Sequence, residues 1–170
     1  MIDQLTLQTI GILLTGISLT VAAAYYTLTI RNTNKTRQAQ LFMQIYSRFD
    51  DPDWMINWAQ VVRQWKWTDY EDWYSKYSPE MDIEAAAQYG SVAAYFEGIG
   101  VLVYKNLIDV DIVADLMSRN IMIFWEKMGP IIKERRIRYN NEYVWEWNEW
   151  LYNKMKKLQP SRKPAYLLNK

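Results

Sequence analysis

The chain contains no cysteine and no histidine among its 170 residues. Without cysteine there is no disulfide framework, and without either residue a Cys/His zinc site is excluded. The absence of histidine also removes the side chain that most often acts as a general acid or base. No nucleophile motif is present either. The sequence therefore predicts that the protein is not an enzyme and that it binds no cofactor.

Charge of either sign is missing from residues 4–30, QLTLQTIGILLTGISLTVAAAYYTLTI. In a helix these residues would extend about 40 Å, which exceeds the roughly 30 Å of a bilayer's hydrocarbon core. We therefore predict that residues 1–30 are a transmembrane anchor. A cleaved signal peptide is disfavoured because no Lys or Arg precedes the run and because the run is long for a signal. A buried soluble helix is disfavoured because the rest of the chain is too short to cover it on all sides.

Positive charge lies only on the C-terminal side of this run, which predicts a single-pass protein of the cell membrane with its N-terminus outside and its folded domain in the cytoplasm. Aromatic and basic side chains at the end of the run are predicted to lie at the inner membrane interface. They are Tyr25, Tyr26, Arg31, Lys35 and Arg37.

Small residues recur along one face of the predicted span, at Gly11, Thr15, Ser18 and Ala22. Small faces allow helices to approach closely in lipid, and hydroxyl groups can form hydrogen bonds across the contact. One interpretation is therefore a helix–helix contact within the membrane. The other is that the hydroxyl groups bond only to their own backbone, and the sequence leaves both open.

The formal net charge is only +1, so no general attraction to nucleic acid is expected. The nine Trp and thirteen Tyr residues are unusually many. Such side chains bury large areas, and they are enriched at protein interfaces. We expect some of them to face a partner, which would be a second copy of this chain or another membrane-protein subunit.

The pattern of apolar and capping residues predicts an all-α protein. A transmembrane helix continues into a cytoplasmic up-and-down helical bundle. The predicted parts are the anchor (1–30), a juxtamembrane helix (31–52) with a kink near 32–36, the bundle (53–158) and a C-terminal tail (159–170). Within the bundle, helices are predicted at 54–66, 68–76, 82–105, 110–128 and 131–158, the last broken near 140–141. Thr68 with Glu71 is predicted to form a capping box, and Gly129–Pro130 to end the fourth helix.

Glu97 lies in the most apolar stretch outside the anchor, AAYFEGIGVLVY. A hairpin near residue 108 is predicted to bring it close to Arg119 or Asn120, because a buried carboxylate needs a partner. A ligand site would use Glu97, Arg119 and Trp125. We favour a structural ion pair over a ligand site. The neighbouring Gly90, Gly98 and Gly100 are expected to admit a helix or a Trp ring at close range.

A basic cluster follows Pro130 and consists of Lys133, Arg135, Arg136 and Arg138. It is compatible with contact to anionic lipid headgroups. It could instead be a solvated face balanced by Glu134 and Glu142, but the anchor, which holds the domain near the membrane, favours the lipid contact.

The C-terminal tail ends with apolar residues at Tyr166, Leu167 and Leu168. Tails of this kind are usually poorly ordered unless they are held by other contacts. We predict that these three residues dock onto a partner.

Three segments together resemble an uncharacterised family of archaeal and bacterial proteins known by a domain-of-unknown-function label. They are RQAQLFMQIYSRF, YFEGIGVLVYKNLIDVDIVADLM and FWEKMGPIIKERR. The resemblance covers nearly the whole chain and implies a single span followed by a helical domain. It implies no activity, and Glu97 and Glu126 gain no role from lying inside the similar segments.

The functional hypothesis is a membrane-anchored helical interaction module, either oligomeric or an accessory subunit of a larger membrane complex. The alternative is a ligand-binding or sensory bundle with a pocket lined by Trp and Tyr. A cavity of a few hundred Å³ between the helices would distinguish the two.

Overall fold

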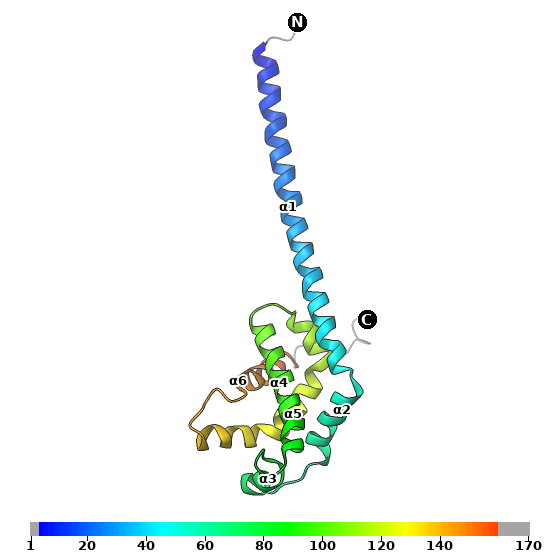
Figure 1. The fold of residues 1–170 in the computed structure, drawn as a ribbon. Helices are drawn as coiled ribbons and strands as arrows, with labels where there is room; N and C mark the ends of the chain where they lie inside the picture. The colour runs from blue at the N-terminus through cyan, green and yellow to red at the C-terminus, as the bar shows by residue number, and fades with distance from the viewer. Residues whose placement is uncertain (1–3, 160–170) are drawn as a thin grey trace. The chain divides into compact units, whose positions relative to one another are not determined.

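The computed structural model describes residues 4–159, which are helical and contain no strand within that range. The all-α class is confirmed. The chain divides into two compact units, one up to Leu41 and one from Phe42 onwards. The first helix, α1 (Gln4–Phe49), crosses this boundary (Figure 1).

In the first unit, α1 is long and apolar enough to cross a membrane. Residues 4–21 are all exposed within the chain, which is unusual for so apolar a segment. The helix continues through residues 32–36 without interruption, where we predicted a kink. No Gly or Pro occurs there, and the Thr36 hydroxyl donates to the Asn32 carbonyl oxygen at 3.1 Å within the helix.

The second unit contains the end of α1 and all the remaining helices. These are α2 (Pro52–Ala59), the short π-helical turn η1 (Gln60–Gln64), α3 (Tyr70–Tyr77), α4 (Ile83–Tyr104), α5 (Val110–Arg138) and α6 (Glu146–Leu158). Figure 1 shows their order.

An aspartate carboxylate caps the N-terminus of each helix from α2 to α5 by accepting a first-turn N–H group. The four residues are Asp51, Asp69, Asp82 and Asp109. The predicted Thr68–Glu71 capping box is wrong. Asp69 caps α3, and the Thr68 N–H instead donates to the Asp72 carboxylate at 3.0 Å.

Helix α5 does not end at Gly129–Pro130 as we predicted, but continues to Arg138. Two buried residues just beyond the proline, Ile131 and Ile132, keep this part of the helix on the core. A proline inside a helix removes one backbone hydrogen bond and favours a bend. The C-terminal part of α5, yellow to gold in Figure 1, runs in a different direction from its first part. The predicted break near residues 140–141 is confirmed, because α6 begins only at Glu146.

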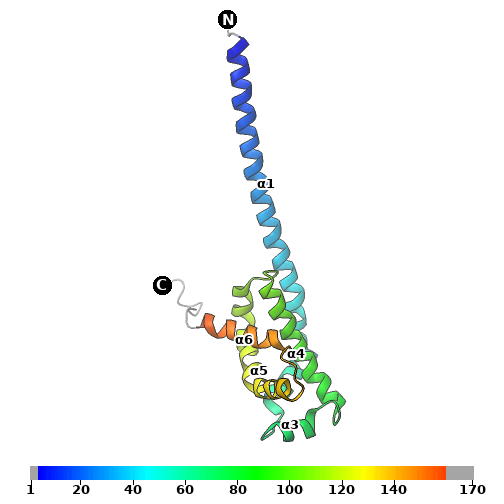
Figure 2. The ribbon, with the colours of Figure 1, turned by 90° about the vertical axis from the view of Figure 1, so that its left-hand side faces the viewer.

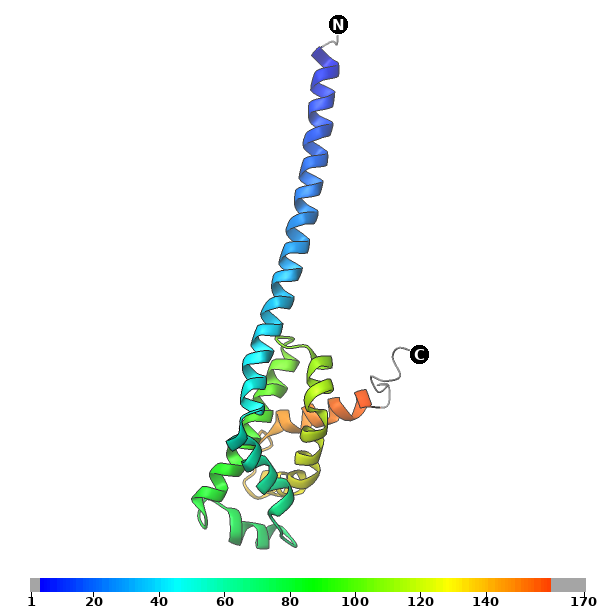
Figure 3. The ribbon, with the colours of Figure 1, turned by 90° about the vertical axis from the view of Figure 1, so that its right-hand side faces the viewer.

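The core forms around α4, where Val92, Ala93 and Phe96 are fully buried. The Phe96 ring lies 5.5 Å from that of Phe124 on α5 and 5.6 Å from that of Trp54 on α2. Helix α6 approaches the backbones of both α4 and α5. Figures 2 and 3 show that α6 runs across these two helices, so the up-and-down arrangement describes α4 and the first part of α5 but not α6.

Candidate functional site

The N-terminus of α6 lacks a cap of its own. Its N-cap residue, Trp145, has a left-handed backbone conformation (φ 52°) and makes no side-chain capping bond. The first N–H groups of a helix have no partner within the helix, so another part of the protein must accept them.

Glu97 on α4 supplies this acceptor. Its Oε2 accepts the backbone N–H of Asn148 and the Nδ2–H of the same residue, each at 2.9 Å. Asn148 is only 2% exposed, and its Nδ2 also donates to the Ala93 carbonyl oxygen at 3.0 Å. Glu97 therefore caps α6 from a neighbouring helix. Its predicted pairing with Arg119 or Asn120 is wrong, because the partner lies 51 residues away in sequence.

Gly100, one turn further along α4, makes the close approach of α6 possible. A Cβ atom placed there would lie 2.5 Å from the Trp147 carbonyl oxygen, well inside contact distance. Nothing lies within 4 Å of such an atom at Gly90 or Gly98. The prediction that glycine admits a helix at close range is thus confirmed at Gly100 alone.

Replacing Glu97 with alanine is expected to lower the free energy of unfolding by about 1–3 kcal/mol, because two N–H groups of Asn148 lose their acceptor. All nine tryptophans lie between residues 54 and 150, so tryptophan fluorescence of the full chain in mild detergent reports unfolding of the second unit. Glu126→Ala is the control, since that side chain is exposed on α5. Equal stability of the two variants would contradict the capping role.

The contribution of Glu97 to the stability of the protein is expected to depend on pH. Burial raises the pKa of the Glu97 carboxyl above its usual 4.5, although the N–H groups of Asn148 and Trp147 act to lower it. The folded protein then binds this proton more tightly than the unfolded chain, so ionisation of Glu97 reduces stability as the pH rises from 4.5 through the raised pKa. Relative to the wild type, Glu97→Gln is therefore expected to gain stability over this window.

Arg136 on α5 holds the segment that leads into α6. Its Nε donates to the Val144 carbonyl oxygen at 2.8 Å and its second terminal nitrogen to that of Trp145 at 3.1 Å. Its remaining terminal nitrogen forms an ion pair with Glu149 on α6. Lys133 adds a second cation to Glu149 at 3.2 Å, and together they hold the pKa of this carboxyl below its usual value despite its burial.

An open groove of about 690 Å³ lies between the end of α5, the connecting segment and the start of α6. Charged side chains of both signs line it, and Ile137 and Tyr143 beside them are 74% and 76% exposed. This groove is therefore an open surface of mixed character and not an enclosed cavity between the helices.

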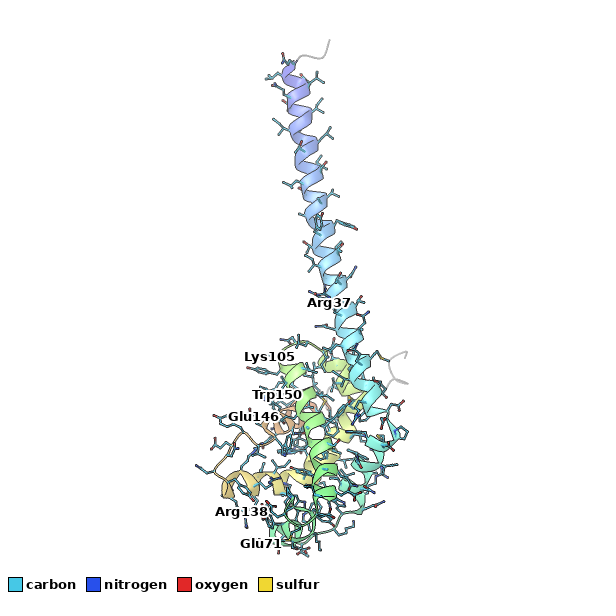
Figure 4. The ribbon with its side chains drawn as sticks, viewed as in Figure 1. Arg37, Glu71, Lys105, Arg138, Glu146 and Trp150 are labelled. Atoms are coloured by element: carbon cyan, nitrogen blue, oxygen red, sulfur yellow. The ribbon has the colours of Figure 1, made fainter. Side chains whose placement is uncertain are left out.

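Three of the four basic residues after Pro130 form ion pairs with acidic side chains of the same chain. Arg136 and Lys133 pair with Glu149, whereas Arg138 pairs with Glu71 and Glu134. Figure 4 shows Arg138 close to Glu71. These pairs support a balanced face over lipid contact, with Glu71 and Glu149 acting alongside the predicted Glu134.

The other two predicted ligand residues do not converge on Glu97. Arg119 is exposed on α5. Trp125 is buried against Gly129, and its ring lies 6.2 Å from that of Tyr152. The three residues therefore form no common pocket in the described structure.

The predicted residues of the span lie on the exposed surface of α1. Gly11 and Thr15 border one shallow hollow, and Ser18 and Ala22 border another together with Tyr25. The Thr15 hydroxyl donates to the Gly11 carbonyl oxygen at 2.8 Å, as the own-backbone interpretation predicts for that residue.

The predicted interface residues are also exposed along α1. The rings of Tyr25 and Tyr26 lie 6.0 Å apart in an edge-to-face arrangement. The predicted docking residues of the tail, Tyr166, Leu167 and Leu168, lie outside the described residues. Between residues 4 and 159, no three acidic side chains are grouped so that they could hold a metal ion.

The described fold is that of an all-α protein with one helix suited to cross a membrane. The family described as a domain of unknown function, DUF4760, matches residues 13–155, and the chain belongs to this family. No curated protein and no solved structure shows a significant match to the chain.

Proposed function

We propose that this protein is a membrane-anchored helical interaction module, and that α1 spans the cell membrane once while the unit from Phe42 onwards folds in the cytoplasm. The observation that carries the proposal is the N-terminal part of α1. It is uncharged from residue 4 to residue 30 and exposed over nearly all of that length. Water does not favour an exposed apolar surface of this size, whereas lipid does.

The distribution of charge supports the orientation. Arg31, Lys35 and Arg37 follow the uncharged run and are exposed on α1. Basic residues next to a span are retained on the cytoplasmic side. The module would assemble with a second copy of the chain or with another membrane-protein subunit.

Two surfaces support an assembly role. The hollows beside Gly11 and Ser18 would admit another helix within the membrane. The groove at the start of α6 exposes Ile137 and Tyr143 beside charged groups. A ligand pocket with Glu97 at its base has no comparable support, because the Oε2 atom of Glu97 already accepts two hydrogen bonds from Asn148.

Single-cysteine variants test this proposal directly, since the chain has no cysteine of its own. A membrane-impermeant maleimide is expected to label Gln4→Cys in intact cells, and to label Ile83→Cys, which is exposed at the start of α4, only after the membrane is permeabilised. Under mild oxidation in membranes, Ser18→Cys is expected to cross-link to a second copy or to a co-purifying subunit carrying a cysteine.

Leu13→Cys is the matched control for cross-linking, because helical spacing places it on the opposite face of α1. Equal cross-linking of Leu13→Cys and Ser18→Cys would contradict a specific contact through the small-residue face. Release of the full chain from membranes by alkaline carbonate would contradict the span itself.

A further inference from the structure

We propose that the tip of the α4–α5 hairpin rests on the surface of the bilayer, with its half-exposed aromatic side chains at the level of the lipid headgroups. This inference depends on the proposed function, which places α1 in the membrane. The tip surface consists of Tyr104, Lys105, Leu107, Trp147 and Trp150.

The aromatic part of the tip surface is a compact cluster from two helices. The Tyr104 ring lies 4.7 Å from the Trp147 ring and 5.6 Å from the Trp150 ring, and the two indoles are 5.9 Å apart. The Lys105 Nζ lies 5.5 Å from the centre of the Tyr104 ring. Figure 4 shows Lys105 and Trp150 on the same side of this unit.

The side chains of the cluster are partly exposed, whereas backbone hydrogen bonds fix the turn next to it. Tyr104 is 49% and Leu107 48% exposed, and both tryptophans are only partly buried. The Leu107 N–H donates to the Leu102 carbonyl oxygen at 2.9 Å, and Asn106 turns the chain with φ 55°. The unit therefore presents these side chains on a fixed turn.

The tip lies at the end of the second unit where the chain enters it. Tyr95 on α4 donates its hydroxyl to the Ile45 carbonyl oxygen at 2.9 Å. Tyr104 lies nine residues later, about 14 Å further along α4. In Figures 1 and 3 the α4–α5 turn is beside the residues that begin the unit.

The length of the chain keeps this end near the bilayer. Only residues 31–41 separate the uncharged run from Phe42, and in a helix they extend about 17 Å. The headgroup region takes up about 5–8 Å of this length, since a bilayer is about 40–45 Å thick with headgroups and about 30 Å without them. The tip surface is thus within reach of the membrane into which α1 inserts.

The composition of the tip surface favours lipid as its partner. Trp and Tyr rings concentrate at membrane interfaces, where one part of the ring is apolar and the other is hydrated. A lysine beside them can reach a phosphate group while its stem stays on the apolar surface. Leu107 would enter the outermost part of the acyl region.

Charge has a smaller part in this contact. Lys154 and Lys157 follow Trp150 at helical spacing, whereas Asp109 and Asp111 begin α5 beside the turn. The Asp109 carboxylate accepts a hydrogen bond from the Asp111 N–H at 2.7 Å. Since charges of both signs are present, the contact is expected to form on neutral phosphatidylcholine and to need no anionic lipid.

The test is a spin label on Leu107→Cys in the full chain, reconstituted in phosphatidylcholine vesicles. Collision with oxygen is compared with collision with a water-soluble nickel chelate. Ile17→Cys is the reference within the span, and Ile83→Cys, which is exposed at the start of α4, is the reference in water. Leu107→Cys is expected to show an oxygen-to-nickel ratio several-fold above that of Ile83→Cys and below that of Ile17→Cys.

Each other outcome has a separate meaning. If Leu107→Cys matched Ile83→Cys while Ile17→Cys remained in lipid, the tip contact would be overturned and the span would stand. A label at residue 107 shielded from both reagents would show a protein partner instead, which also overturns the inference. A water-like Ile17→Cys would remove the proposed function and the inference with it. Unchanged tryptophan fluorescence of each labelled variant confirms that it is folded.

Discussion

Arg136→Ala is expected to lower the free energy of unfolding by about 2–3 kcal/mol, because a partly buried cation that bonds to several acceptors is lost. The side chain is 15% exposed and bonds to three groups at once. Its loss leaves Glu149 with Lys133 as its remaining cation and removes the donor to the Val144 and Trp145 carbonyl oxygens. The segment before α6 should therefore loosen, and α6 with it.

Arg138→Ala is the matched control for this experiment. Arg138 lies two residues later on the same helix and has two carboxylate partners, Glu71 and Glu134, but its side chain is 40% exposed. Exposed pairs contribute about 0–1 kcal/mol, so this variant should remain close to the wild type. Denaturation of the full chain in mild detergent, followed by tryptophan fluorescence, measures both. A loss at residue 138 as large as that at residue 136 would refute the special role of Arg136.

Gly100→Ala is expected to destabilise the protein by about 1–3 kcal/mol, the usual cost of overpacking a well-packed contact. The added Cβ would meet the Trp147 backbone, which cannot rotate away as a flexible side chain would. Helix α6 must then move away from α4. That movement would lengthen the bonds from Asn148 to Glu97, so part of the cost would come from the cap.

Gly98→Ala, on the same helix, is expected to change the stability in the opposite direction. Gly98 is exposed and an added Cβ meets nothing within 4 Å. Alanine there should stabilise the protein by roughly 0.5–1 kcal/mol, because glycine is a poor helix former. The same fluorescence measurement applies. Stabilisation at both positions would show that helix propensity, and not contact with α6, decides the result.

Local sequence signals predicted most helices but not how they meet. Asp82 and Asp109 lie directly before α4 and α5 and act as their N-caps, so the sequence indicates where these two helices begin. Glu97 was correctly identified as a carboxylate needing a polar partner. The partner was wrong because we placed it on the next helix, and the bond to Asn148 depends on the path of the chain between α5 and α6.

Proline at position 130 illustrates a different limit. Its local preference is to begin or interrupt a helix, and the sequence prediction followed that preference. The structure retains the helix because buried residues on both sides, Met128 and Ile132 among them, hold it against the core. Tertiary packing therefore outweighs the local preference, and only an apolar pattern continued across the proline would have indicated this outcome.

The crossing helix α6 also constrains the order of events during synthesis. Its buried residues Leu151 and Met155 follow α4 and α5 in the chain, and they cover surfaces of these two helices that are made earlier. Those surfaces include Glu97 and Arg136. Their partners on α6, Asn148 and Glu149, are synthesised later. Until α6 has been synthesised, this unit has an incomplete core, so its folding can finish only after α6 has emerged from the ribosome.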